Sequence, residues 1–185
     1  MLQSDPQGRP DVFGYGGVSW EISAHVRAQS SPGGTSRGGA TRPKVRFCLV
    51  FERELLSVPV MRQVLGDTLR GIGVNEDSVA DILLAATEAC TNVVLHAGQS
   101  APAYTVAATV DSAACRVEVT DAGQGCSGRC RGTVRRSADL AESGRGFAIM
   151  RACVDAVTLR SAPGQGTRVV LDKRIHWEEP LARTA

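Results

Sequence analysis

The amino-acid sequence predicts an α/β domain of the α+β two-layer type, in which three helices cover one face of a mixed, mostly antiparallel sheet. Paired runs of alternating apolar and polar residues, joined by short turns, indicate β-hairpins. Three other segments carry apolar residues at the spacing of an α-helix. The order is strand, helix, helix, strand, strand, helix, strand, strand, which is typical of a sheet with its helices on one side.

The chain divides into three parts by composition. Residues 1–43 are rich in Gly, Ser, Pro and Arg, so we predict a disordered N-terminal extension. Within it, residues 18–26 (VSWEISAHV) suggest a short docking element, although an apolar patch inside a disordered segment explains them as well. Residues 44–175 carry the regular patterns and form the predicted domain, and residues 176–185 follow as a C-terminal tail.

The first predicted elements of the domain are a strand and an amphipathic helix. The run 45–51, VRFCLVF, places four apolar side chains on one face of a strand: Val45, Phe47, Leu49 and Phe51. Pro59 suits the first turn of a helix, and Gly71 or Gly73 ends it. Apolar residues between them recur at helical spacing: Val60, Val64, Leu65 and Leu69.

A second, longer helix is predicted from about Glu76 to Ala97. Asn75 is a favourable N-cap, and the acidic residues Glu76 and Asp77 stabilise the positive end of the helix dipole. Gly98 is expected to end the helix.

Two hairpins, a long polar segment and a short helix complete the domain. The first hairpin pairs residues 104–110 with 115–121, and the last pairs 157–161 with 167–173. Residues 126–146 show no sustained period, so we predict a loop of about twenty residues, and loops of that length are usually functional and often act as lids. A short helix is predicted over residues 146–154.

Charge and hydropathy narrow the class of function. The 21 basic and 19 acidic residues give a net charge of +2, which offers no electrostatic case for a nucleic acid or a strongly anionic membrane as partner. The N-terminus lacks the apolar core of a signal peptide, and no run of about eighteen apolar residues occurs. We therefore expect a soluble, cytoplasmic protein that interacts with proteins and small molecules.

The six cysteines are scattered through the hydrophobic pattern instead of forming the framework of a small disulfide-rich domain. We predict reduced and mostly buried thiols. Cys126 and Cys130 lie in a polar stretch, but no second pair at metal-ligand spacing accompanies them, so no zinc site is predicted.

The long helix carries Glu88, Asn92 and His96 at intervals of four residues. Four residues rotate an α-helix by about 40° beyond a full turn and raise it by about 6 Å, so these side chains form one polar stripe. The other faces of the helix supply core contacts: Val79, Ile82, Leu83, Ala86, Cys90, Val93 and Val94. A polar stripe of this kind is most often exposed to solvent. Whether it lines a cleft instead has to be inferred from other motifs in the sequence.

Three glycine-rich segments accompany the stripe. DAGQG (121–125) ends a strand, GRG (144–146) opens a helix, and GQGT (164–167) occupies a hairpin turn. Each alone is typical of a turn. The GRG segment is also suited to a polyphosphate, because backbone amides at a helix N-terminus bind anions.

Asp121 ends its strand with the side chain pointing inward. By strand alternation it shares a face with Val117 and Val119, and a buried carboxylate is costly unless it is paired or protonated. Asp121 therefore requires a partner from the chain or from a ligand. The parity of the last strand turns Thr167 inward as well.

Taken in order, these segments resemble the motifs of the Bergerat-fold ATPases, the histidine-kinase-like (GHKL) group that includes gyrase, histidine kinases and MutL. EACTNVVLH (88–96) looks like the N box, DAGQG like the DxGxG box, GRGF like the second glycine box and GQGT like the final glycine motif. The resemblance covers about residues 44–175. The short lid, the small size and the ExxxNxxxH form are most similar to bacterial anti-sigma-factor serine/threonine kinases.

The resemblance implies how a nucleotide base would be recognised. Asp121 would accept a hydrogen bond from the adenine amino group, Gly123 and Gly125 would let the backbone approach the ring, and Thr167 would lie beside adenine, commonly through water.

The same resemblance implies roles at the phosphates. Asn92 would hold Mg²⁺ that bridges the phosphates of ATP, and Glu88 would act as the general base of phosphoryl transfer. The remaining residues expected at the nucleotide are His96, Gly144, Arg145, Gly146, Phe147 and Gly166. Phe147 stands where the family usually has Leu.

The implied function is that of a Mg-ATP-dependent protein serine/threonine kinase that serves as an anti-sigma factor in a partner-switching system and so regulates transcription. Its partners would be an anti-anti-sigma protein, as phosphoacceptor, and a sigma factor or similar regulator, with a homodimer left open. The alternative is a nucleotide-gated protein-binding module in which ATP orders the lid without phosphotransfer. The presence of both Glu88 and Asn92 favours the kinase.

Overall fold

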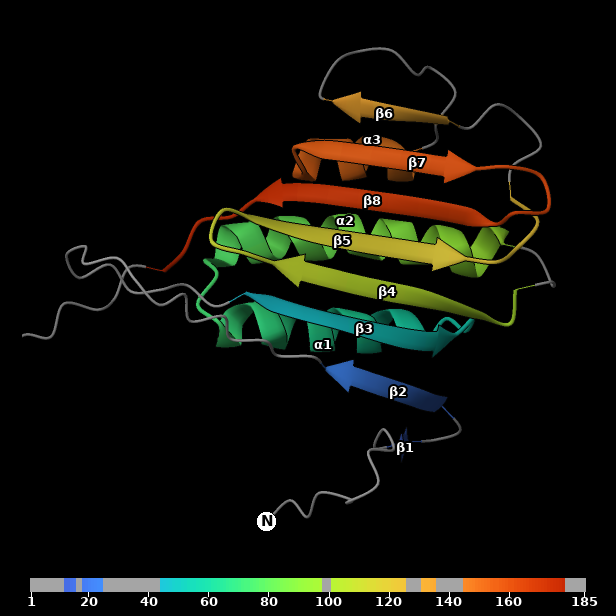
Figure 1. The fold of residues 1–185 in the computed structure, drawn as a ribbon, viewed down its shortest axis with the longest axis horizontal. Coiled ribbons are helices and arrows are strands. Elements are labelled where there is room, and N and C mark those ends of the chain that lie inside the picture. The colour runs from blue at the N-terminus through green and yellow to red at the C-terminus, as the bar shows by residue number, and fades with distance from the viewer. Residues whose placement is uncertain are drawn as a thin grey trace, which may run out of the picture.

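A computed structural model describes residues 12–15, 18–24, 44–97, 101–125, 131–135 and 145–178. The strands within these ranges form one sheet in the order β1-β2-β3-β4-β5-β8-β7-β6, and the described helices, α1, α2 and α3, lie together on one of its faces (Figure 1). The predicted α+β two-layer sandwich is therefore confirmed. Every pairing among the described strands is antiparallel.

The centre of the sheet consists of the strands that the hydrophobic pattern predicts. Their bounds are β3 Val45–Glu52, β4 Ala103–Val110, β5 Ala114–Asp121, β7 Ala156–Ser161 and β8 Thr167–Arg174. In each of these strands, all the buried residues have the parity that faces the helices. Strand alternation thus fixes which side chains point toward the helices and which point away.

Strands at both edges of the sheet correct two expectations. β1 (Val12–Tyr15) and β2 (Val18–Ala24) lie inside the segment predicted to be disordered, and β2 pairs with β3. β6 (Arg131–Arg135) lies inside the predicted loop 126–146 and pairs with β7. In β2, Val18, Trp20 and Ile22 alternate with polar residues, a strand pattern that the Gly-, Ser- and Pro-rich composition of the whole segment outweighed in the prediction. β6 has little apolar pattern of its own, and the sheet edge at β7 supplies its backbone partners. Arg145 and Gly146 of the predicted loop begin α3, and the other residues of both segments lie outside the described residues.

The helices agree closely with their predicted ranges. α1 spans Ser57–Gly71, α2 spans Glu76–His96 and α3 spans Arg145–Cys153. Asn75 caps α2 as predicted, because its Oδ1 accepts a hydrogen bond of 3.0 Å from the Ser78 backbone N–H. α1 and α2 are linked across their surface by Arg62, whose guanidinium donates to the Leu83 carbonyl and to Thr87 Oγ1.

The chain remains packed on the domain beyond the predicted boundary at residue 175. Trp177 forms an isolated bridge with Val74, and its Nε1 donates a 2.8 Å hydrogen bond to the Ser112 carbonyl. The division into an extension, a domain and a tail otherwise stays a prediction.

The core lies between the sheet and the helices and is mainly aliphatic, with Phe51 and Tyr104 stacked within it. The cluster includes Phe51, Leu65, Ile82, Val119 and Leu171, each at most 2% exposed. Within the described ranges, α2 has the length and hydropathy that a membrane-spanning helix would need, but 56% of that window is buried inside the domain. Burial of this kind is also found in the core helix of a soluble protein.

Candidate functional site

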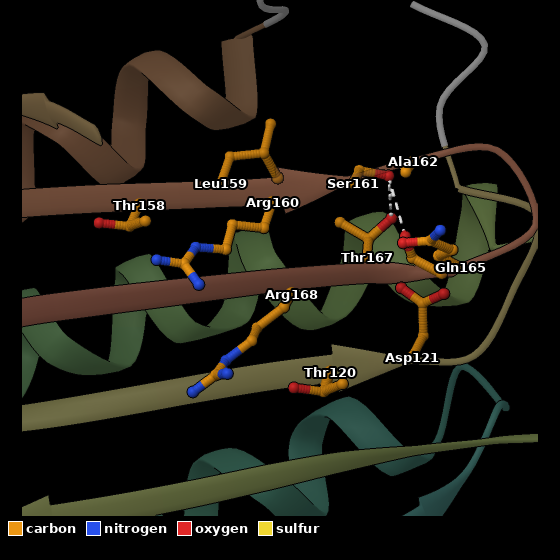
Figure 2. Close-up of a pocket in the computed structure, with 11 residues that line it drawn as sticks. Thr120, Asp121, Thr158, Leu159, Arg160, Ser161, Ala162, Gln165, Thr167 and Arg168 are labelled. Atoms are coloured by element: carbon orange, nitrogen blue, oxygen red, sulfur yellow. Dashed lines mark hydrogen bonds between the residues drawn. The ribbon is translucent and has the colours of Figure 1, made fainter. Parts of the chain in front are cut away.

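Three polar side chains form a row across three neighbouring strands at the end of the sheet. The register pairs Asp121 of β5 with Thr167 of β8, and Thr167 with Ser161 of β7. All three side chains lie on the helix-facing side, and Asp121 and Ser161 are buried, with 5% and 8% exposed. Figure 2 shows these residues close together. We call Asp121, Thr167 and Ser161 the polar row.

Hydrogen bonds hold the polar row in place. Asp121 Oδ1 accepts a 2.8 Å bond from the Gly123 backbone N–H, so the carboxylate is tied to the turn that follows its strand. Ser161 Oγ donates to the Gly166 carbonyl at 3.0 Å and lies 2.9 Å from Thr167 Oγ1 (Figure 2). A carboxylate has accepting capacity beyond a single bond, so Asp121 can still receive a donor from a ligand.

Glycines allow the backbone segments next to the polar row to pack against one another without side chains between them. A Cβ on Gly123 would lie 2.1 Å from the Ala97 carbonyl oxygen, and one on Gly166 would lie 2.0 Å from the Asp121 carbonyl oxygen. Gly125 has a φ of +65° and would meet the Ala162 carbonyl oxygen at 2.1 Å. These three positions accept only glycine, because each contact is with rigid backbone. The DAGQG and GQGT motifs are thus brought together with the C-terminal end of α2.

A second polar group forms where the N-terminus of α3 meets α2. A Cβ on Gly146 would lie 2.8 Å from Glu88 Oε2 and 3.6 Å from both amide atoms of Asn92. The structure therefore brings together Glu88, Asn92 and Gly146, three residues that come from two separate predicted motifs. We call them the α2–α3 junction. Backbone N–H groups in the first turn of a helix have no intrahelical partner and attract anions.

The other predicted nucleotide residues have different surroundings. His96 is exposed in the last turn of α2, and Arg145 is exposed at the first position of α3. The Phe147 side chain belongs to the hydrophobic core, so only its backbone amide is free to serve a ligand. Gly144 lies outside the described residues.

The sequence analysis missed Ser161, which belongs to this region, and Lys173, which lies at the opposite end of β8. Ser161 has the same inward parity at a strand end as Asp121, and that signal could have identified it. Lys173 is mostly buried: its Nζ lies 2.5 Å from Asp81 Oδ2 of α2 and donates at 2.8 Å to the Cys153 carbonyl at the end of α3. Lys173 thereby ties α3 to α2, and a cation at a helix C-terminus is favourable.

The buried thiols act as packing residues. Burial raises the pKa of Cys90 and of Cys115 to about 12, so both remain protonated at neutral pH and are poor nucleophiles. Cys48, Cys90, Cys115 and Cys153 are free thiols, as the sequence predicts. Cys126 and Cys130 lie outside the described residues.

A cavity of about 730 Å³ lies next to the polar row. Several residues that line it point away from the helices by strand alternation: Thr120, Thr158, Arg160 and Arg168. The polar row itself, Asp121, Thr167 and Ser161, also lines the cavity, so its lining comes from both faces at this end of the sheet.

The residues of the α2–α3 junction suit a nucleotide with Mg²⁺. The amide oxygen of Asn92 is a ligand type that this hard cation accepts. It lies beside the space that a Cβ on Gly146 would fill, so a small group can approach both the helix N-terminus and the amide. The donor set and the space thus fit the cofactor that the resemblance implies.

Comparison with known proteins agrees with these motifs. Residues 51–173 match the model of the histidine kinase-like ATPase domain. A protein of Clostridium acetobutylicum named anti-sigma F factor is 26% identical over 102 residues, which cover 53% of this chain and 71% of the relative. An anti-sigma F factor of Pasteuria penetrans is 33% identical over 112 residues, which cover 57% of this chain and 75% of the relative.

Proposed function

The chain belongs to the histidine kinase-like ATPase family, and on that basis we propose that it is a Mg-ATP-dependent protein serine/threonine kinase that acts as an anti-sigma factor. Family membership supports ATP binding, and the names of both relatives support an anti-sigma role in a partner-switching system. The contact of Gly146 with Glu88 and Asn92 carries the catalytic part of the proposal.

Each residue of the α2–α3 junction has a task in this proposal. The first backbone amides of α3 bind the phosphates, and the Asn92 amide oxygen holds Mg²⁺, which would neutralise phosphate charge. Glu88 Oε2 lies beside the same backbone, so a serine or threonine hydroxyl that approaches the γ-phosphate comes within its reach. Glu88 then accepts the hydroxyl proton as the oxygen attacks the γ-phosphorus, while the bond from that phosphorus to the bridging oxygen breaks and ADP leaves.

The polar row recognises the base in the same proposal. The Asp121 carboxylate accepts a hydrogen from the adenine amino group, and Thr167 lies beside it on the neighbouring strand. Gly123 and Gly166 exclude side chains from the backbone around the row. The nucleotide therefore extends from the polar row to the α2–α3 junction.

The names of both relatives support a sigma factor as partner, and the resemblance to anti-sigma-factor kinases implies the phosphoacceptor. The phosphoacceptor is an anti-anti-sigma protein, and the sequestered protein is a sigma factor or similar regulator, so the protein regulates transcription from the cytoplasm. Neither a nucleic acid nor a membrane is a direct partner, given the balanced charge of the chain. A homodimer is compatible with this arrangement.

Phosphoryl transfer is the test that separates the kinase from its alternative. Protein partners recovered with the tagged protein from its native cell are incubated with it, Mg²⁺ and ATP labelled in the γ-phosphate. We expect label on a serine or threonine of one partner, and no label when Mg²⁺ is chelated. Tight ATP binding that labels no partner would favour the nucleotide-gated binding module.

A further inference from the structure

Ser161 stands at one end of the polar row, where its hydroxyl forms hydrogen bonds with Gly166 and with Thr167. Its Oγ lies 3.0 Å from the Gly166 carbonyl oxygen and 2.9 Å from Thr167 Oγ1, and the residue is 8% exposed (Figure 2). The geometry at Gly166 is fixed, because this glycine has a φ of +70° and packs against the Asp121 backbone. Ser161 therefore has a rigid carbonyl on one side and a hydroxyl on the other.

The chemistry of these groups fixes the direction of both bonds. A carbonyl oxygen can only accept, so the single hydroxyl hydrogen of Ser161 points to Gly166. Toward Thr167, Ser161 Oγ can then only accept, and Thr167 must donate its own hydrogen to Ser161. Thr167 has no hydrogen left, and its Oγ1 offers a ligand lone pairs alone.

From this chain of bonds we propose that Ser161 is a positioning residue that determines nucleobase specificity, a role that rests on the proposed ATP site. By accepting the Thr167 hydrogen, Ser161 makes Thr167 an acceptor. The Asp121 carboxylate is an acceptor as well when ionised. The polar row thus presents acceptors to position 6 of a purine and selects a base that has an amino group there.

Adenine and hypoxanthine differ at this position. At position 6, adenine has an amino group, which donates, whereas hypoxanthine has a keto oxygen, which only accepts. Hypoxanthine also carries a hydrogen on N1, where adenine has a lone pair, so the proposed selection concerns the contact at position 6. A keto oxygen that faces lone pairs loses its hydrogen bond and is left unpaired, so it is disfavoured. A water held by both Asp121 and Thr167 spends its two hydrogens on them, and it too offers only lone pairs to the base. The selection therefore holds for direct and for water-mediated contact.

The test compares ATP with ITP, which carries hypoxanthine and has the same phosphates and ribose. Calorimetry with Mg²⁺ gives both dissociation constants for the wild type, Ser161→Ala, Thr167→Val and the double variant. We expect Ser161→Ala to lower the ATP-over-ITP ratio by about three- to tenfold, the worth of one hydrogen bond, because the freed Thr167 hydroxyl can donate to the keto oxygen. In the Thr167→Val background, Ser161→Ala should change the ratio no further.

Two control variants separate specificity from a structural role. Ser161→Thr keeps the hydroxyl and should keep the wild-type ratio. Thr158→Ala lies on the same strand but on the far face of the sheet, and should also keep it. Circular dichroism melting shows which variants fold. If Ser161→Ala does not fold, Thr167→Val provides the test instead. It removes the Thr167 acceptor, so it must lower the ATP-over-ITP ratio of affinities.

The outcomes distinguish this inference from the function on which it rests. A wild type that binds ATP and ITP equally contradicts an adenine site and thus the proposed function. A wild type that prefers ATP, combined with an unchanged ratio in Ser161→Ala, overturns only the role of Ser161. Equal weakening of both nucleotides in Ser161→Ala also overturns it, because that is the effect of a structural residue.

Discussion

The polar row and the α2–α3 junction differ in how their parts are held. The polar row lies on three paired strands, and short backbone contacts at Gly123 and Gly166 leave no freedom around Asp121. The junction lies between two helices, and its closest contact is between a glycine and the flexible end of Glu88. Recognition of a base needs fixed geometry, whereas a substrate hydroxyl must enter and leave, so the two constructions suit two different tasks.

The largest expected effect concerns the rate of transfer at the junction. Glu88→Gln keeps the size of the side chain but removes the base, so phosphoryl transfer should slow by about 10²- to 10⁴-fold. ATP affinity should stay near that of the wild type, since the general base Glu88 contacts the incoming hydroxyl group of the substrate. Single-turnover transfer and a nucleotide titration measure the two quantities. Transfer at the wild-type rate would remove Glu88 from the mechanism.

The next effect concerns binding at the polar row. Asp121→Asn replaces a charged acceptor by an amide, and the loss of such a hydrogen bond is worth about 1.5 to 3 kcal/mol, or roughly ten- to hundredfold in ATP affinity. Calorimetry with ATP and GTP measures it. If Asp121→Asn binds ATP as tightly as the wild type does, the adenine ring is recognised by other residues.

Gly123→Ala tests how rigid the polar row is. The new Cβ would lie 2.1 Å from the Ala97 carbonyl oxygen, so the backbone must move, and overpacking of this kind lowers the free energy of unfolding by about 1 to 3 kcal/mol. Gly71→Ala is the matched control, because a Cβ there meets nothing within 4 Å, and it should be neutral or slightly stabilising. Urea unfolding measures the free energy of unfolding of both variants. Equal values for Gly123→Ala and Gly71→Ala would mean that the backbone around the polar row can shift to accept a side chain.

The smallest expected effect comes from Asn75→Ala, which should leave the function of the polar row and of the α2–α3 junction unchanged. Asn75→Ala removes the N-cap of α2, at a cost of about 1 kcal/mol in the free energy of unfolding. Asn75 lies at the far end of the helix from Asn92, so ATP affinity and transfer rate should be retained. A large loss of affinity would show that the junction depends on the whole length of α2.

Strand alternation and helical spacing predicted the regular elements and much of the site. They turned Asp121 and Thr167 inward and aligned Glu88 with Asn92, because these relations are local along one element. β6 could not be predicted this way, since its sequence has little apolar pattern and it is stabilised by pairing with β7. β2 could have been predicted, because Val18, Trp20 and Ile22 alternate with polar residues. Gly146 lies close to Glu88 because of the way α2 and α3 pack. The spacing of residues along either helix could not predict this contact.

Transfer rate at saturating Mg-ATP, measured in single turnovers for Asp121→Asn and Glu88→Gln beside the wild type, tests most directly whether the two regions have separate tasks. Saturation removes differences in affinity, so the rate reports the α2–α3 junction alone. We predict that Asp121→Asn transfers phosphate within about threefold of the wild-type rate and that Glu88→Gln is slower by at least about 10²-fold. An equal loss of rate in both variants would contradict the division between base recognition and catalysis.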